Sequence, residues 1–110
     1  MPGAGIRWIV RDRDGNDVYL TDERWRHITE PWGHPEMAEF EDELRETVRS
    51  GDRHQDSLNP QKYRYIREFN DLPEHNTHIV AVVLFKLIES EQAQSVSNNF
   101  VVTAYQKEVT

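Results

Sequence analysis

Three extended runs follow one another in the second half of the chain, and they constrain the fold more than any other feature of the sequence. They comprise residues 63–69, 77–87 and 99–107, with polar turns at 70–76 and 89–98. The middle run contains an uninterrupted apolar stretch at 79–85, which is typical of a buried strand. Consecutive strands joined by short turns pair in antiparallel fashion. The sequence therefore predicts an antiparallel sheet in this half of the chain.

The first half predicts a hairpin and then a short helix. Side chains alternate along residues 6–11, turn residues follow at 14–16, and an extended run resumes at 18–20. The side chain of Thr21 or of Asp22 can accept a hydrogen bond from the free amides at the start of a helix. That helix carries an unusual density of arginine, tryptophan and histidine for an acidic chain.

A second, acidic helix is predicted to begin near Pro35 and to end at Gly51. Its apolar residues recur every three or four positions, as in an amphipathic helix: Met37, Phe40, Leu44 and Val48. We expect its acidic residues to line the solvent side; the alternative is a docking surface for a basic partner such as an antitoxin. Residues 52–61 are predicted to form a polar loop. The fold class is therefore α+β, with a hairpin and two helices packed on one face of the sheet.

Composition limits the classes of function. At 110 residues the chain is expected to form one domain spanning residues 1–110. It contains no cysteine, which excludes disulfides, a thiolate nucleophile and cysteine-based zinc sites. Neither a signal peptide nor a membrane-spanning run is recognisable, so we expect a cytoplasmic protein. The net charge of -7 argues against broad affinity for nucleic acid.

The order of short motifs resembles that of a nuclease superfamily. After the hairpin come ERWRHI, HPE, ETVRSGD, YRYIREF and FVVTAY. From about residue 6 to residue 107 this order is similar to the phage-associated branch of the barnase, EndoU, colicin and RelE-like nucleases. The resemblance implies a helical N-terminal part packed against an antiparallel sheet of about four strands. It also implies a small metal-independent ribonuclease of the toxin or mobile-element type.

Four residues are candidates for catalysis. The resemblance makes His27, in the Trp-x-His-Ile pattern, the candidate general acid or base, and an imidazole titrates near neutral pH; the alternative is a capping or core histidine. His34, in the His-Pro-Glu motif, is a second candidate or else a turn former. Thr103 and Tyr105 share one face of a strand because they are two residues apart. Their hydroxyls can donate to a phosphate, unless Tyr105 packs in the core.

Basic and aromatic side chains supply the candidate substrate-binding groups: Arg24, Arg26, Tyr65, Arg67 and Lys86. Alternation divides one strand between two faces, with Lys62, Arg64 and Ile66 on one and Tyr63, Tyr65 and Arg67 on the other. The second set can stack on single-stranded RNA, or can be ordinary strand aromatics that cover the helices. His75 and His78 beside Glu74 lie in a predicted turn, where their spacing does not suit zinc, so no metal site is expected.

These features predict an endoribonuclease that cleaves RNA by attack of the ribose 2′-OH, without a metal or other cofactor. RNA is the expected partner, and an antitoxin or immunity protein is a further one. The alternative is a catalytically inactive binding module that acts through a protein partner or a small ligand, and the acidic net charge favours it.

Overall fold

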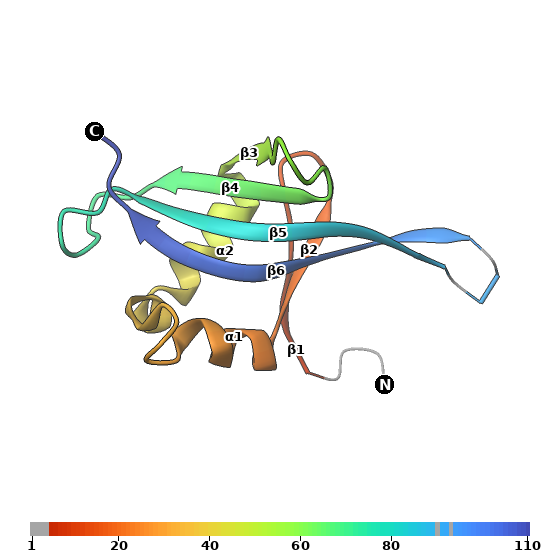
Figure 1. Ribbon diagram of the computed structural model, residues 1–110, viewed down its shortest axis with the longest axis horizontal. Helices are drawn as coiled ribbons and strands as arrows, with labels where there is room; N and C mark the ends of the chain where they lie inside the picture. Colours follow the sequence, from red (N-terminus) through yellow and green to blue (C-terminus); the bar gives the residue numbers. More distant parts are fainter. Residues whose placement is uncertain (1–4, 90, 93) are drawn as a thin grey trace.

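The computed structural model describes residues 5–89, 91–92 and 94–110, which form a sheet with flanking helices (Figure 1). The elements in chain order are β1 (Ile6–Arg11), β2 (Asp17–Thr21), α1 (Asp22–Thr29), the 3-10 helix η1 (Pro35–Glu39), α2 (Glu41–Ser50), β3 (Asp52–Gln55), β4 (Lys62–Glu68), β5 (His78–Glu89) and β6 (Ser95–Lys107). The α+β class is confirmed. Within these described ranges, no helix combines the length and apolarity needed to cross a membrane.

The sheet is larger than the expected four strands. Across the described residues it has six strands in the order β1-β2-β6-β5-β4-β3. The expected antiparallel pairing of β4, β5 and β6 is confirmed. The opening hairpin joins the same sheet because β2 pairs with β6, and this pairing is parallel over Val18↔Asn99 and Tyr19↔Phe100. Such a short parallel contact between distant segments has no signature in the sequence.

Two predicted loops are partly strands. The predicted loop at 52–61 begins with β3, and the predicted turn at 89–98 is shortened because β6 already begins at Ser95. Both extensions are largely polar or exposed, so they lack the apolar alternation that marks a half-buried strand. Backbone pairing with β4 and β5 determines them instead. The β5–β6 hairpin thereby projects well beyond the rest of the sheet (Figure 1).

The acidic helix is divided at Phe40, which the sequence did not predict. Phe40 has φ -124° and ψ 32°, outside helical geometry, and separates η1 from α2. The break allows Met37 of η1 and Leu44 and Val48 of α2 to enter one core, where all three are fully buried. The predicted end at Gly51 is confirmed, and the Gly51 amide donates to the carbonyl of Thr47.

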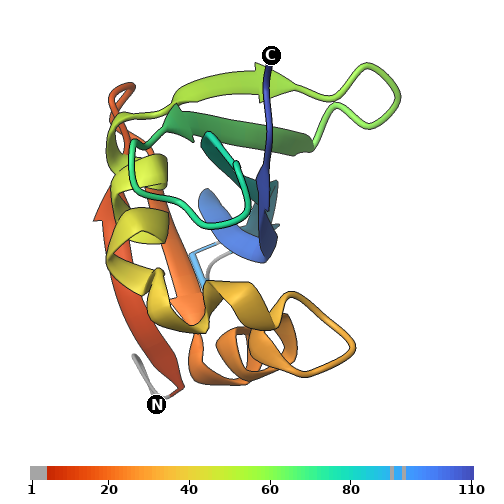
Figure 2. The same ribbon diagram turned by 90° about the vertical axis from the view of Figure 1, so that its left-hand side faces the viewer.

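The sheet curves strongly, so that its two edges approach each other around α2 (Figure 2). Helix α2 contacts β1, β4 and β5. In the β1–β2 turn, Arg13 donates to the Gly51 carbonyl at 3.2 Å, and Asp14 pairs with Arg53 of β3 at 3.2 Å. The Tyr65 hydroxyl of β4 donates to the buried Asp12 carboxylate at 2.5 Å. This closure directs Tyr65 into the core and leaves the opposite face of β4 open.

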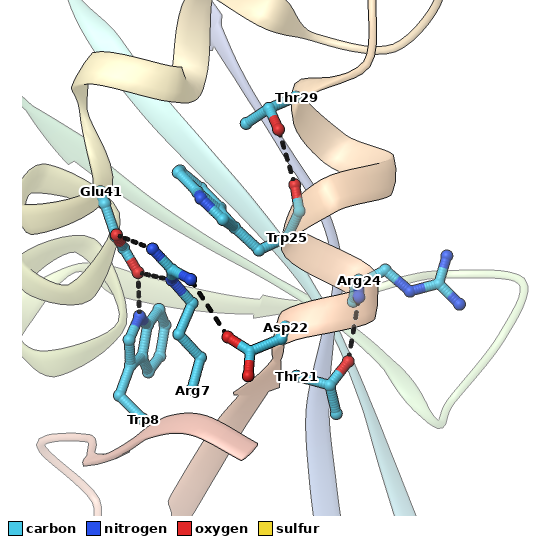
Figure 3. A network of polar contacts seen from close by, with 8 residues as sticks. All are labelled: Arg7, Trp8, Thr21, Asp22, Arg24, Trp25, Thr29 and Glu41. Carbon is cyan, nitrogen blue, oxygen red and sulfur yellow. Dashed lines mark hydrogen bonds and ion pairs between the residues drawn. The ribbon is translucent and has the colours of Figure 1, made fainter. Parts of the chain in front are cut away.

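A polar network fixes the start of α1 against β1 and α2 (Figure 3). Arg7 donates to Asp22 at 3.1 Å and to Glu41 at 3.0 Å, while the Trp8 indole donates to Glu41 at 3.0 Å. The Arg7 guanidinium also lies 5.6 Å from the centroid of the Trp25 ring. The hydrogen bond from Arg7 lowers the pKa of Glu41 below its ordinary value. The prediction that the acids of this helix line the solvent side is therefore wrong for Glu41, whose carboxylate faces Arg7 and Trp8.

Candidate active site

The outer face of the sheet, opposite α2, carries a hollow of about 450 Å³. Its lining comes from three neighbouring strands: Lys62 and Arg64 of β4, Val82 and Leu84 of β5, and Val102, Thr103 and Tyr105 of β6. Arg64 pairs with Val82, and Val82 pairs with Thr103, so these three side chains form one row across the sheet. The predicted common face of Thr103 and Tyr105 is confirmed, and Tyr105 lies outside the core cluster.

A β-bulge lies beside this row. Val82 pairs with Thr103, but Val83 pairs with Val101, so Val102 is an extra residue in β6. A bulge bends the strand that carries it and redirects the neighbouring side chains, and bulges are frequent beside active sites. Here Val102 and Thr103, which lie at the bulge, both line the hollow.

His34 approaches the hollow from the side of β6. Strand β2 pairs with β6 only up to Phe100, and helices α1 and η1 also contact β6. The loop between them places the His34 ring 5.6 Å, centroid to centroid, from the ring of Tyr105. His34 Nδ1 faces Glu36 Oε2 at 3.5 Å, which leaves Nε2 as the nitrogen available to a ligand.

The approach of His34 depends on a glycine. The His34 amide donates to the carbonyl of Ile28 at 2.6 Å, so the loop folds back onto the last turn of α1. A Cβ on Gly33 would lie 2.7 Å from the carbonyl oxygen of His27 and 2.8 Å from that of Ile28. Both contacts are closer than real Cβ atoms make, and both partners are backbone atoms. Any side chain here would push the loop away and displace the His34 ring from Tyr105.

Arg64 is held at the hollow by Asp56. Arg64 Nη1 donates to Asp56 Oδ2 at 2.8 Å, and the amides of Leu58 and Asn59 donate to Asp56 Oδ1. The pKa of Arg64 is raised above its ordinary value mainly by Asp56, with a smaller contribution from the Tyr105 hydroxyl. The Arg64 hydrogen bond and the two amides lower the pKa of Asp56 from 3.8 to about 2. The guanidinium is therefore charged and fixed in place at neutral pH.

We expect the carboxyl carbon of Asp56 to titrate with a midpoint of about 2 in a carbon-detected NMR experiment. Because the folded pKa lies below the unfolded value, the stabilisation from this carboxylate is complete above about pH 4 and is lost as the pH falls towards 2. Replacing Arg64 by glutamine removes the main cause of the shift, so the midpoint should rise. A midpoint near 4 in the unaltered protein would mean that Arg64 is not fixed by Asp56.

The other candidate residues lie elsewhere. His27 lines neither this hollow nor the smaller one beside it, and its Nδ1 lies 3.3 Å from Glu30 Oε1. Arg26 is exposed. Tyr65 is 1% exposed and belongs to the core, and Arg67 donates to Ser50 of α2 at 3.0 Å. Tyr65 and Arg67 thus lie on the opposite face of β4 from Arg64, where Tyr65 is the core-covering strand aromatic considered above as the alternative.

Arg24 and Lys86 are close to the outer face. Arg24 lines a second hollow with Tyr19 and Phe100, and the Lys86 Nζ lies 5.8 Å from the centroid of the Phe100 ring. The sequence interpretation placed Lys62 and Arg64 on one strand face but did not assign them to the site. Strand alternation could have indicated them, because Thr103 and Tyr105 must lie on the same face of the sheet as one of the two sets of side chains of this strand.

His54 is a further residue that sequence reasoning missed. It pairs with Arg64 across β3 and β4, so it extends the row of Arg64, Val82 and Thr103 to the edge of the sheet. Its position was hidden because residues 52–61 were predicted to be a loop.

The described residues contain no group of three or more side chains suited to holding a metal ion. No protein-family model matches the chain, and neither a curated protein nor a solved structure matches it.

Proposed function

We propose that the protein is a metal-independent endoribonuclease and that its active site is the hollow on the outer face of the sheet. The observation that carries the proposal is the grouping of His34, Tyr105, Thr103, Arg64 and Lys62, which come from β4, β6 and the loop between α1 and η1. An imidazole, two cations and two hydroxyls can supply the proton transfer and the charge stabilisation that cleavage of RNA by its own 2′-OH requires. The order of sequence motifs supports the same class of nuclease.

In the proposed reaction His34 accepts the proton of the ribose 2′-OH. The 2′ oxygen attacks the adjacent phosphorus, the bond from phosphorus to the 5′ oxygen breaks, and the leaving 5′ oxygen takes a proton from solvent at the open side of the hollow. Arg64 and Lys62 neutralise the charge that develops on the phosphate, and Tyr105 and Thr103 donate hydrogen bonds to it. Glu36 faces Nδ1 and orients the imidazole, in the way that the third residue of a catalytic triad orients the base.

His34 takes the acid–base role in this proposal, ahead of His27. Its ring contacts Tyr105, whereas the ring of His27 lies beside Glu30 and outside the lining of the hollow. The acidic net charge is compatible with the proposal because no aspartate or glutamate is among the described residues that line the hollow. Local potential governs the binding of a few phosphates more than total charge does.

Incubation of the purified protein with end-labelled RNA in excess EDTA tests the proposal. We expect cleavage that yields a 2′,3′-cyclic phosphate and a 5′-hydroxyl, because the 2′ oxygen is the nucleophile. The same oligonucleotide with 2′-deoxyribose throughout should stay intact. Either intact RNA under these conditions, or cleavage that requires an added metal ion, would contradict the proposed reaction.

The exposed acids of η1 and α2 favour a second candidate function. Glu39 and Asp42 are exposed, and α2 lies on the opposite side of the sheet from the hollow. A basic protein, such as an antitoxin or immunity protein, can bind this surface by charge complementarity. RNA that stays intact in the cleavage experiment would favour such a binding module over the nuclease.

A further inference from the structure

A second hollow adjoins the proposed active site. It has a volume of about 220 Å³ and is lined by Tyr19, Thr21, Arg24, Phe100 and Val101. Phe100 pairs directly with Leu84, which lines the first hollow. Directly paired residues project from the same side of a sheet, so both hollows open on the outer face, where Val101 of the second is next to Val102 of the first along β6.

Two aromatic rings form one side of the second hollow. The rings of Tyr19 and Phe100 lie 5.9 Å apart between centroids and are tilted by 38°. Both side chains are half-buried, and neither belongs to the hydrophobic core, so packing of the interior does not explain them. The Tyr19 hydroxyl donates to the side chain of Asn98 at 3.0 Å, which fixes its ring. A fixed aromatic pair at the rim of a hollow is a surface on which a planar base can stack.

The charged side chains that line the two hollows are all basic. Lys62 and Arg64 line the first and Arg24 lines the second, while no acidic residue lines either one within the described part of the chain. The hollow between β1 and α2 differs, because Asp42 and Glu46 line it together with Arg45 and Arg49. In a chain with 20 acidic residues against 13 basic ones, linings without a carboxylate set these two hollows apart, although Asp56 pairs with Arg64 beside the first. Such linings are suited to a polyanion.

Resting on the proposed function, we infer that the second hollow is a subsite for a base of single-stranded RNA that lies next to the nucleotide being cleaved. Tyr19 and Phe100 stack on the base, and Arg24 and Lys86 bind the phosphates on either side. The substrate class is single-stranded because the bases of a duplex are already stacked on each other and cannot reach an aromatic surface.

The length of the surface supports a substrate of more than one nucleotide. Phe100 and Tyr105 lie five positions apart in β6, which corresponds to roughly 15 Å at the rise of an extended strand. The His34 ring lies at the Tyr105 end, and the aromatic pair lies at the other. A strand bound along β6 therefore contacts both hollows, and occupancy of the second positions the scissile phosphate in the first.

Binding of a non-cleavable 2′-fluoro RNA octamer, measured by fluorescence anisotropy, tests this subsite. We expect the single strand to bind more tightly than the same octamer annealed to its complement. Phe100→Leu keeps the hollow apolar but removes the ring, and it should weaken single-strand binding roughly 5- to 100-fold. Arg24→Gln should weaken binding and lower the slope of log K against log salt by roughly 0.7. Arg49→Gln, which removes the same charge from α2, should bind as the unaltered protein does.

The outcomes separate the subsite from the proposed reaction. Equal binding of single strand and duplex, or unchanged binding by both Phe100→Leu and Arg24→Gln, would overturn the subsite even if RNA is cleaved in EDTA. Tighter binding of the single strand than of the duplex, weakened by both variants, would support the subsite even if no RNA is cleaved. In that case only the proposed reaction would be overturned. Because Arg24 of α1 is only half-buried and lies outside the core, its variant tests the subsite even if Phe100→Leu does not fold.

Discussion

Replacing His34 by alanine is expected to lower the rate of RNA cleavage in EDTA roughly 10²- to 10⁴-fold, the usual effect of losing one general acid or base. The physical reason is that the variant has no group beside Tyr105 that can accept the 2′-OH proton. The fold should be preserved, because the His34 side chain is about 40% exposed and the backbone bond to Ile28 does not involve it. Rates and thermal unfolding of the same preparation measure both effects.

The matched variants are His27→Ala and His75→Asn. His27 lies outside the hollow, so its loss should change the rate by less than about threefold if His34 is the base. His75 is exposed in the 70–76 turn with φ 63°, a conformation that asparagine tolerates, and this variant controls for the loss of any histidine. A large loss of rate in His27→Ala with normal cleavage by His34→Ala would transfer the acid–base role to His27.

The second large effect concerns stability, and it is expected at the contact that closes the curved sheet. Asp12 is 6% exposed, and its carboxylate accepts from the Tyr65 hydroxyl, from the amides of Asp14 and Asn16 and from the Asn16 side chain. Replacing Asp12 by alanine should lower the free energy of unfolding by about 2–4 kcal/mol, because it leaves a buried hydroxyl and turn amides without an acceptor. Tyr65→Phe, which removes one hydrogen bond to a charged group, should cost about 1.5–3 kcal/mol.

Urea unfolding of both single variants and of the double variant measures the coupling. Since the two groups are in direct contact, the double variant should lose less than the sum of the single losses. Additive losses would mean that the Asp12–Tyr65 bond does not hold the sheet edges together. Gly15→Ala strains the same turn at φ 86° without a contact near its Cβ, so its loss measures a general effect on the turn with the acceptor kept.

The same pair predicts a dependence on alkaline pH. Burial, and then the hydrogen bond to Asp12, raise the pKa of Tyr65 above its ordinary value of 10.0. The stabilisation from the neutral hydroxyl is therefore complete below pH 10 and is lost as the pH rises above it, because only the unfolded chain releases the proton there. Burial alone would raise the pKa of Asp12, but the bonds from Tyr65 and Asn16 lower it, so Asp12 remains charged throughout this range. Tyr65→Phe should lack the alkaline loss that Tyr65 causes.

Local patterns in the sequence predicted most of the elements. Alternation and turn residues predicted the β1–β2 hairpin, and the apolar run at 79–85 predicted the central strand β5. Thr21 was one of two predicted caps, and its hydroxyl accepts from the Arg24 amide at 3.0 Å. Each of these features depends on residues within one or two turns or within a single strand, which is why the sequence alone was sufficient.

The candidate site was predictable only in part. Strand periodicity placed Thr103 and Tyr105 on one face, and this needed no knowledge of their neighbours. The neighbours themselves depend on register: Arg64 meets Thr103 only through Val82, and His54 joins the same row only because β3 exists. Periodicity could not decide between His27 and His34 as the histidine beside Tyr105, because that choice depends on how the loop after α1 returns over Ile28.

The sequence by itself thus determined the α+β class, the two helical regions and the strand faces, since these follow from side-chain periodicity and local hydrogen bonding. Only the tertiary structure decided that β2 joins β6 in parallel, that the sheet curves until Asp12 reaches Tyr65, and that His34 lies against Tyr105. These features join residues 53 to 81 positions apart or depend on one close backbone approach at Gly33. Such contacts depend on packing of the whole chain into one core, which local patterns do not encode.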